Sequence, residues 1–137
     1  MAFLNRRSHI MAVALAAMGL CFSSGTFAQN APGAVRTVLT RHDTTAPGFE
    51  AVLVQVDIPV GGREGRHTHP CVALGYVAQG TLTLEQEGRP ATDYKTGDSF
   101  LLEPDKIHEG VNKGSVPVKV LATFVVKKGD TLTTPAK

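Results

Sequence analysis

The sequence predicts an all-β domain of the barrel or sandwich type. From residue 35 onward, short apolar segments alternate with turn-forming Gly, Pro, Asn and Asp, and no stretch shows a convincing helical period. Residues 49–58 and 81–85 alternate apolar with polar side chains, as expected of strands with one face in solvent. Nine such segments within about 90 residues are typical of a barrel or a sandwich.

Each predicted strand ends at residues that favour turns. The Gly61-Gly62 pair follows the second segment and Gly80 separates the fourth from the fifth, because glycine adopts positive φ angles without steric cost. The last residues, 129–137, show no alternation and are expected to form a frayed tail. In chain order, the predicted strands are 35–40, 49–58, 66–69, 74–79, 81–86, 91–94, 99–102, 108–112 and 116–126.

Residues 1–28 have the three-part pattern of a secretory signal peptide. Arg6 and Arg7 lie in a segment with no acidic residue, 10–22 is an apolar run, and 23–28 is small and polar, ending at Ala28. The apolar run is shorter than the roughly 20 residues that span a bilayer. We therefore expect cleavage after Ala28, secretion to the periplasm without a membrane anchor, and a single mature domain, 29–137, whose core covers about 35–127.

Two features of the leader concern the route of export and lipidation. The paired arginines suggest a twin-arginine signal, but the residues after them, Ser8-His9-Ile10, fit that pattern poorly, so the general secretory and twin-arginine routes both stay open. Cys21 follows Leu20, where a lipoprotein signal needs a small residue. Lipidation is therefore not expected.

The charge of the chain argues against nucleic-acid binding, and its cysteine content argues against a disulfide in the mature domain. The chain has 14 Lys and Arg against 12 Asp and Glu, and removal of 1–28 takes away two arginines and no acid, which leaves 12 of each sign. A neutral mature chain is not expected to bind nucleic acid. Only Cys71 remains within 29–137, so no intrachain disulfide can form.

Three histidines form the main candidate site. His67 and His69 flank Thr68 on the predicted strand 66–69, and His108 lies well downstream. On a strand, residues i and i+2 face the same side about 6.5–7 Å apart, so two imidazoles can converge on one ion. A solvated polar pair is the alternative for an isolated His-x-His. His42 lies in a polar stretch and is expected to be an exposed loop residue.

Two spaced motifs extend this pattern. They are Gly61-x5-His67-Thr68-His69, with Gly80 after ten more residues, and Gly97-x10-His108-x3-Asn112. Together they resemble the two signature motifs of the cupin superfamily, over roughly 49–126. The resemblance implies a single jelly-roll β-barrel in which His67, His69 and His108 hold one divalent metal ion, one of Fe, Mn, Zn, Ni or Cu.

The chain departs from the cupin pattern at position 73. Cupins usually place a glutamate there, seven residues before the closing glycine, and this chain has Ala73. Three neutral imidazoles then leave a divalent ion its full charge, so metal affinity should fall and attraction for anionic ligands should rise. Cysteine dioxygenase and certain diketone-cleaving dioxygenases resemble this arrangement. A site that has lost its metal is the alternative.

Cys71 has two interpretations. On a straight strand it would lie about 13 Å from His67, too far for both to bind one ion. A turn at Pro70 would instead let the thiolate replace the absent carboxylate as a metal ligand. The alternative is a small buried residue that fills the core, which is the usual role of a free cysteine.

We expect metal-dependent chemistry on a small molecule, of the dioxygenase or isomerase kind. The ion would act as a Lewis acid toward a chelating oxygen ligand, or would bind O₂ if it is iron. The alternative is a non-catalytic periplasmic module that binds a small anion or a metal, because no recognisable general base accompanies the histidines. Cupins commonly dimerise through edge strands, and 35–40 offers such an edge for a homodimer.

Overall fold

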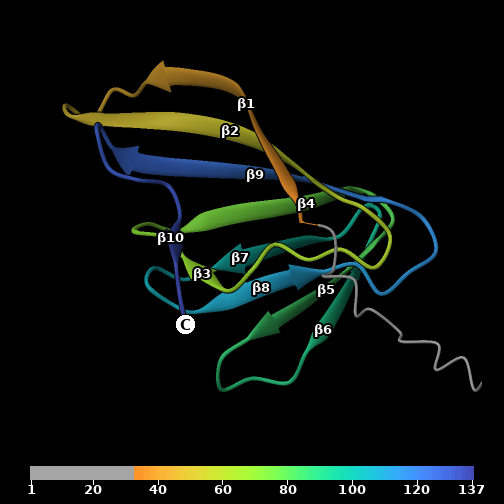
Figure 1. Ribbon diagram of the computed structural model, residues 1–137. Helices are drawn as coiled ribbons and strands as arrows, with labels where there is room; N and C mark the ends of the chain where they lie inside the picture. Colours follow the sequence, from red (N-terminus) through yellow and green to blue (C-terminus); the bar gives the residue numbers. More distant parts are fainter. Residues whose placement is uncertain (1–32) are drawn as a thin grey trace, which may run out of the picture.

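The computed structural model describes residues 33–137 and folds them into ten β-strands (Figure 1). That range contains no helix, and so none that could cross a membrane. The predicted signal peptide, 1–28, lies outside the described residues. The strands are β1 (Val35–Asp43), β2 (Phe49–Ile58), β3 (His67–Thr68), β4 (Ala73–Gln79), β5 (Thr81–Gln86), β6 (Thr92–Lys95), β7 (Ser99–Leu102), β8 (His108–Val111), β9 (Val118–Lys127) and β10 (Thr134–Pro135).

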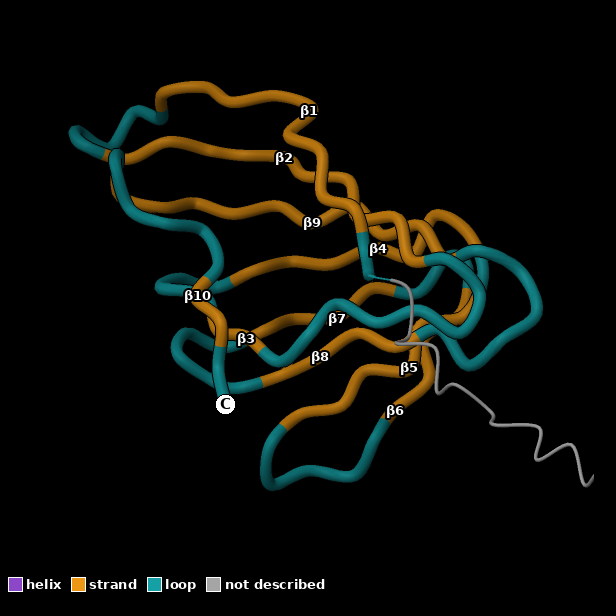
Figure 2. Tube along the Cα trace, in the orientation of Figure 1, coloured by secondary structure: helices purple, strands orange, loops and turns teal. Residues whose placement is uncertain are grey.

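The strands form two antiparallel five-stranded sheets that face each other (Figures 1 and 2). One sheet has the order β1-β2-β9-β4-β7, and the other has the order β10-β3-β8-β5-β6. In the first sheet, β2 and β9 pair along their whole length, from Phe49 opposite Lys127 to Ile58 opposite Val118. The predicted all-β fold class is confirmed.

The hydrogen-bonded ladders do not close, which corrects the expectation of a closed barrel. Within residues 33–137, no ladder joins one sheet to the other. The chain passes from β4 to β5 at Gly80, whose φ is 78°, and a Cβ there would lie 2.7 Å from the carbonyl oxygen of Pro117. This tight corner sends consecutive strands into different sheets, so the jelly roll is a two-layer sandwich.

The core lies between the two sheets because alternate residues of the long strands point inward. Every second residue of β2 is buried, and the residues between them are only partly buried, which is the alternation that the sequence predicts for 49–58. The opposite sheet contributes Leu82 and Leu84. The residues of this core cluster are Val52, Val54, Val56, Ile58, Ala73, Val77, Leu82, Leu84, Leu102, Val118, Val120, Phe124 and Val126.

Residues 129–137 do not form a frayed tail, contrary to the expectation from the sequence. β10 pairs with β3, with Thr134 opposite Thr68 and Pro135 opposite His67, and the N–H of Ala136 donates to a carbonyl oxygen of the segment before β3 at 2.9 Å. A two-residue strand leaves no alternation in the sequence, so this pairing escapes pattern analysis. The C-terminal segment thus completes the sheet edge beside the histidines.

Candidate metal centre

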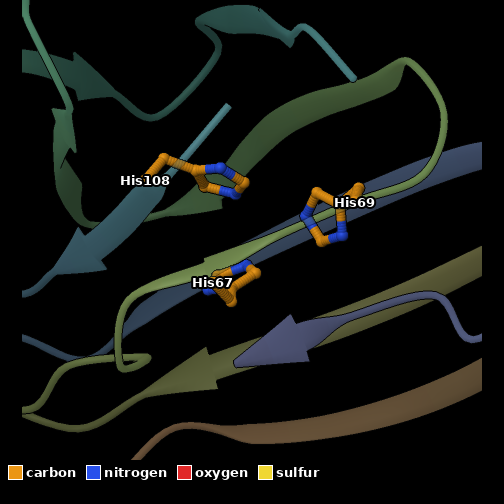
Figure 3. Close-up of side chains that lie close together, drawn as sticks. All are labelled: His67, His69 and His108. Atoms are coloured by element: carbon orange, nitrogen blue, oxygen red, sulfur yellow. The ribbon is translucent and has the colours of Figure 1, made fainter. Parts of the chain in front are cut away.

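The three histidines meet where β3 and β8 pair (Figure 3). His67 opens β3 and lies directly opposite His108, the first residue of β8, while His69 follows just after β3. The ring centroids lie 4.3–4.9 Å apart, and one candidate ligand nitrogen from each ring lies within 4.8 Å of the others. Each residue is only 2–4% exposed, which excludes the alternative of a solvated pair.

Backbone carbonyl groups determine the tautomer of all three rings. The Nδ1 atom of His67 lies 2.8 Å from the carbonyl oxygen of Gly65, that of His69 lies 2.6 Å from Leu132 O, and that of His108 lies 2.9 Å from Lys106 O. A carbonyl oxygen only accepts hydrogen bonds, so each Nδ1 must carry the proton and donate it. Each Nε2 atom is therefore an unprotonated acceptor.

Burial keeps the three imidazoles neutral. Desolvation lowers the pKa of His67 to about 3 and that of His69 to about 4, and it also lowers the pKa of His108. The positive charge of Arg36 lowers each pKa further, whereas the bonds to backbone carbonyls oppose the shift. The neutral ring is the form that binds a metal ion.

The cluster fits a divalent cation. The Nε2 atom of His108 is buried and has no hydrogen-bond partner, although such a buried polar atom is normally satisfied. Two further unprotonated Nε2 atoms lie beside it. A cation bound by all three would satisfy them together, and protein sites for Zn and other transition metals commonly use this donor set.

The histidines line one side of a cavity of about 280 Å³ between the sheets. This volume lies just below the range of about 300–1,000 Å³ that is usual for ligand sites. The ring of Phe124 packs against His69 with centroids 4.9 Å apart. The remaining walls are mostly apolar and include Val38, Val54, Val56, Ala73, Leu82, Leu84, Phe100, Leu102, Val120 and Ala122.

Ala73 lines the same cavity, at the position where cupins usually place an acid. It opens β4, lies opposite Phe124 of β9, and is 1% exposed. Its side chain is a methyl group, so β4 contributes no carboxylate to the histidine cluster. The replacement of the usual cupin glutamate by Ala73 therefore lies inside the cavity that contains the histidines.

Cys71 lies outside the histidine cluster. The half-buried residue packs against the hydrophobic core. Burial raises the pKa of its thiol, and the charge of Asp130 raises it further, so the protonated form dominates at neutral pH. These observations favour the core-filling interpretation over metal ligation. His42 also lies outside the cluster, and it is exposed on β1 rather than in a loop.

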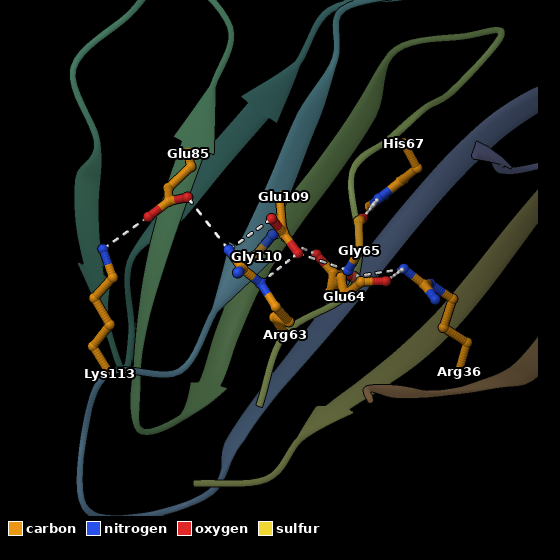
Figure 4. Close-up of polar contacts among 9 residues, drawn as sticks. All are labelled: Arg36, Arg63, Glu64, Gly65, His67, Glu85, Glu109, Gly110 and Lys113. Carbon is orange, nitrogen blue, oxygen red and sulfur yellow. Dashed lines mark hydrogen bonds and ion pairs between the residues drawn. The ribbon is translucent and has the colours of Figure 1, made fainter. Parts of the chain in front are cut away.

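The cavity also contains an acidic residue, Glu64, that no sequence pattern predicts. Its side chain is 13% exposed, accepts a hydrogen bond from the N–H of Gly110 at 3.0 Å, and pairs with Arg36 at 3.3 Å (Figure 4). Burial raises the pKa of this carboxyl, and the Arg36 charge counteracts the shift. Glu64 lies in the loop between β2 and β3, where no periodic pattern marks burial. Glu64 is therefore a carboxylate that lines the same cavity as the histidines but is not part of their cluster.

A second buried acid supports the loop that precedes β3. Glu109 is 6% exposed and accepts two hydrogen bonds from Arg63, at 2.8 and 2.9 Å (Figure 4). It also accepts one from the N–H of Gly65 at 2.9 Å. Because the carbonyl group of Gly65 orients His67, Glu109 helps to hold that ring in place.

Two facing antiparallel sheets that bury a His-x-His pair and a distant third histidine in one cavity define the cupin class of β-proteins. The chain belongs to the cupin family, because the family model for the cupin domain matches residues 54–124. Comparison with curated protein sequences finds no significant match.

Solved structures show the same fold at low sequence identity. An uncharacterised double-stranded β-helix protein from Klebsiella pneumoniae superposes with a TM-score of 0.62 and 22% identity, covering 80% of this chain and 89% of that one. A cupin domain from Bordetella pertussis gives 0.59 and 22%, covering 72% and 98%. An oxalate oxidase, in complex with the substrate analogue glycolate, gives 0.56 and 20%, covering 70% and 55%. These similarities establish the fold.

Proposed function

We propose that this cupin binds one divalent transition-metal ion through the Nε2 atoms of His67, His69 and His108, and that the ion acts on a small molecule in the cavity. The three backbone hydrogen bonds that leave these buried nitrogens unprotonated carry the proposal. Imidazole ligands suit Fe, Ni, Cu and Zn. Mn prefers carboxylate ligands, and this site lacks the usual one because residue 73 is alanine. The donor set therefore favours the other four metals over Mn.

The bound ion would supply Lewis acidity toward an oxygen atom of the ligand, or a site for O₂ if it is iron. The chain sets the conditions for this chemistry. Apolar side chains from both sheets form most of the wall around the cluster, and such low-polarity surroundings strengthen electrostatic interactions inside the cavity. Neutral ligands leave the ion its full charge, so the cavity favours an anionic oxygen ligand.

A non-catalytic binding module is the second candidate function. The observation that favours it is that Glu64 has no free carboxylate oxygen to act as a general base. One oxygen accepts a hydrogen bond from Gly110 and the other accepts one from Arg36. Both oxygens therefore have a structural partner. Product formation from small carboxylic acids by the metal-loaded protein in air, followed by mass spectrometry, separates the candidates, because a binding module leaves the acids unchanged.

We further propose that the protein is exported to the periplasm after loss of residues 1–28 and that two copies pair along an edge strand. The leader pattern supports export. β1 supports pairing, because it is the outermost strand of its sheet and all nine of its residues are exposed. Light scattering of the purified mature protein measures the mass of the particle in solution. We expect twice the mass of one chain, and the mass of a single chain would contradict the proposed pairing.

Single-histidine variants test the metal proposal. His67→Ala, His69→Ala and His108→Ala should each lose stoichiometric metal and remain folded, because apolar residues from both sheets form the core. The exposed His42 lies outside the cluster, so His42→Ala is the matched control and should keep its metal. Full metal occupancy in any cluster variant would contradict the proposed ligand set.

A further inference from the structure

Arg36 is the only lysine or arginine side chain that lines the histidine cavity in the part of the chain that the structure describes. It projects from β1, opposite Val56 of β2, and its side chain is 33% exposed. Arg36 and all three histidines line this one cavity. The guanidinium group can therefore contact a small molecule that occupies the space beside the rings.

Glu64 holds Arg36 in a fixed position while leaving donors unused. The Nη2 atom of Arg36 donates to both the backbone carbonyl oxygen and Oε1 of Glu64, each at 3.3 Å. The other carboxylate oxygen, Oε2, accepts from the N–H of Gly110 at 3.0 Å. Within residues 33–137, Nε and Nη1 of Arg36 make no hydrogen bond to protein. An arginine fork with unused donors in a mostly apolar cavity binds carboxylate groups well.

We propose that Arg36 is the anion anchor of this cavity and binds the carboxylate group of a small, otherwise apolar acid. The hydrocarbon body of the acid would lie against the apolar walls, including Phe100 and Leu102. A volume of about 280 Å³ suits a small ligand better than a drug-sized one. This inference rests on the proposed function in sharing its cavity, but it does not require the metal.

The same strand provides a matched control. Arg41 of β1 pairs with Glu50 of β2, whose side chain is only 8% exposed. Like Arg36, Arg41 is a partly exposed arginine on a buried glutamate, but it does not line the cavity. Loss of either arginine leaves a buried acid without its partner. Only loss of Arg36 should change ligand binding.

The test is titration of the full mature protein with benzoate and with uncharged benzamide, followed by NMR or calorimetry. Metal-free protein, prepared with a chelator, and zinc-loaded protein are titrated separately. Benzoate should bind in both forms, and Arg36→Gln should weaken it by at least about 10-fold in the metal-free form, as expected for loss of a charge-assisted hydrogen-bonded pair. Benzamide binding should not change, and Arg41→Gln should leave both probes unchanged.

Arg36→Lys keeps the positive charge without the fork and covers the case in which the glutamine variant does not fold. It should bind benzoate several-fold more weakly than the unaltered protein. Benzoate binding that is equal in Arg36→Lys and the unaltered chain, or no saturable benzoate binding in the metal-free form, would overturn the inference. Failure to bind zinc would count against the proposed metal site alone, because the metal-free titration does not depend on it.

Discussion

At the scale of single residues, hydrogen bonds to backbone carbonyl groups decide which histidine nitrogen faces the cluster. The carbonyl groups of Gly65, Leu132 and Lys106 come from three separate segments of the chain. Each one accepts the Nδ1 proton of a single ring, so the backbone, rather than other side chains, orients the candidate ligands. Ala73 affects the charge of the site, because it places a buried methyl group where the carboxylate of an acid would offset part of the charge of a bound metal ion.

Ala73→Glu should tighten divalent-metal binding by about 10-fold or more, because a carboxylate added beside three neutral imidazoles attracts the cation directly. Residue 73 lines a cavity, so the longer side chain has space. The measurement is a competition titration with a chelator of known affinity. Ala91→Glu places the same charge on an exposed residue outside the cavity and is the control. Equal gains in both variants would show a general charge effect instead of a new ligand.

Cys71→Ser should leave metal affinity unchanged, since the thiol lies outside the histidine cluster and packs against the core. The same competition titration measures this. A sharp loss of affinity would mean that the thiolate binds the ion, because a neutral hydroxyl is a far poorer ligand. In that case Ala73→Glu would also help little, because the vacant ligand position would already be filled.

The histidines were predictable from sequence, and their polar surroundings were not. Strand geometry explains why His67 and His69 share one side, and the cupin motifs indicate that His108 joins them. Glu64 and Arg36 belong to different segments and carry no periodic signal. Their pairing across the cavity depends on how β1 lies over the loop before β3, which only the folded structure shows.

At the scale of elements, the short strand β3 depends on its neighbours. It has only two residues, and it lies between β8 and β10. Glu109 holds the preceding loop through Arg63 and Gly65. The C-terminal segment contributes the carbonyl group of Leu132 to His69 and also lines the cavity with Thr131 and Thr133. The site is therefore assembled from elements far apart in sequence.

Deletion of residues 131–137 should weaken metal binding by about 10- to 100-fold, because it removes the hydrogen-bond acceptor of His69 and the strand beside β3. The affinity is measured by chelator competition, and circular dichroism verifies the fold. Deletion of Lys137 alone keeps both features and should leave the affinity unchanged. Full affinity after the longer deletion would show that the C-terminal segment does not position His69.

The long strands were predicted well because they obey a simple physical pattern. β2 matches the predicted 49–58, since one buried face imposes a period of two on its side chains. The bounds of β5 and β7 also match 81–86 and 99–102, although β5 buries three consecutive residues. β10 was missed, because two residues are too few to show that period. Its position follows from long-range pairing with β3.

At the scale of the whole molecule, the apolar core and the histidine cluster occupy the same interior, and different residues form them. The core comprises valines, leucines and other apolar residues from both sheets, whereas all three histidines belong to β3, β8 and the residue after β3. The strand pattern predicted a barrel or a sandwich, and the resemblance to cupins favoured the closed barrel, whereas the structure has two separate sheets. The choice depends on corners such as Gly80, where the chain changes sheets.

Removal of metal should therefore lower the melting temperature without unfolding the protein. A ligand present at 100 times its Kd stabilises the native state by about 2.7 kcal/mol. Thermal melts with and without a chelator measure the difference, and circular dichroism at room temperature should not change. His69→Ala should melt at one temperature under both conditions. A circular dichroism spectrum typical of an unfolded chain after chelation would contradict the expectation that the core folds without the metal.

Export should yield a mature chain that begins at Gln29, because the small residues before it form a signal-peptidase site. The intact mass of protein recovered from the periplasm measures the start of the chain. A mass that includes residues upstream of Gln29, or a lipid adduct on Cys21, would contradict this expectation.

The most direct test of the proposed metal site is the elemental composition of the protein purified from its native compartment without added metal. We expect about one transition-metal ion per chain, consistent with one cluster of three unprotonated Nε2 atoms from His67, His69 and His108. That metal should be absent from His108→Ala prepared in the same way. Folded, unaltered protein that contains no transition metal and takes up none on titration would contradict the central claim.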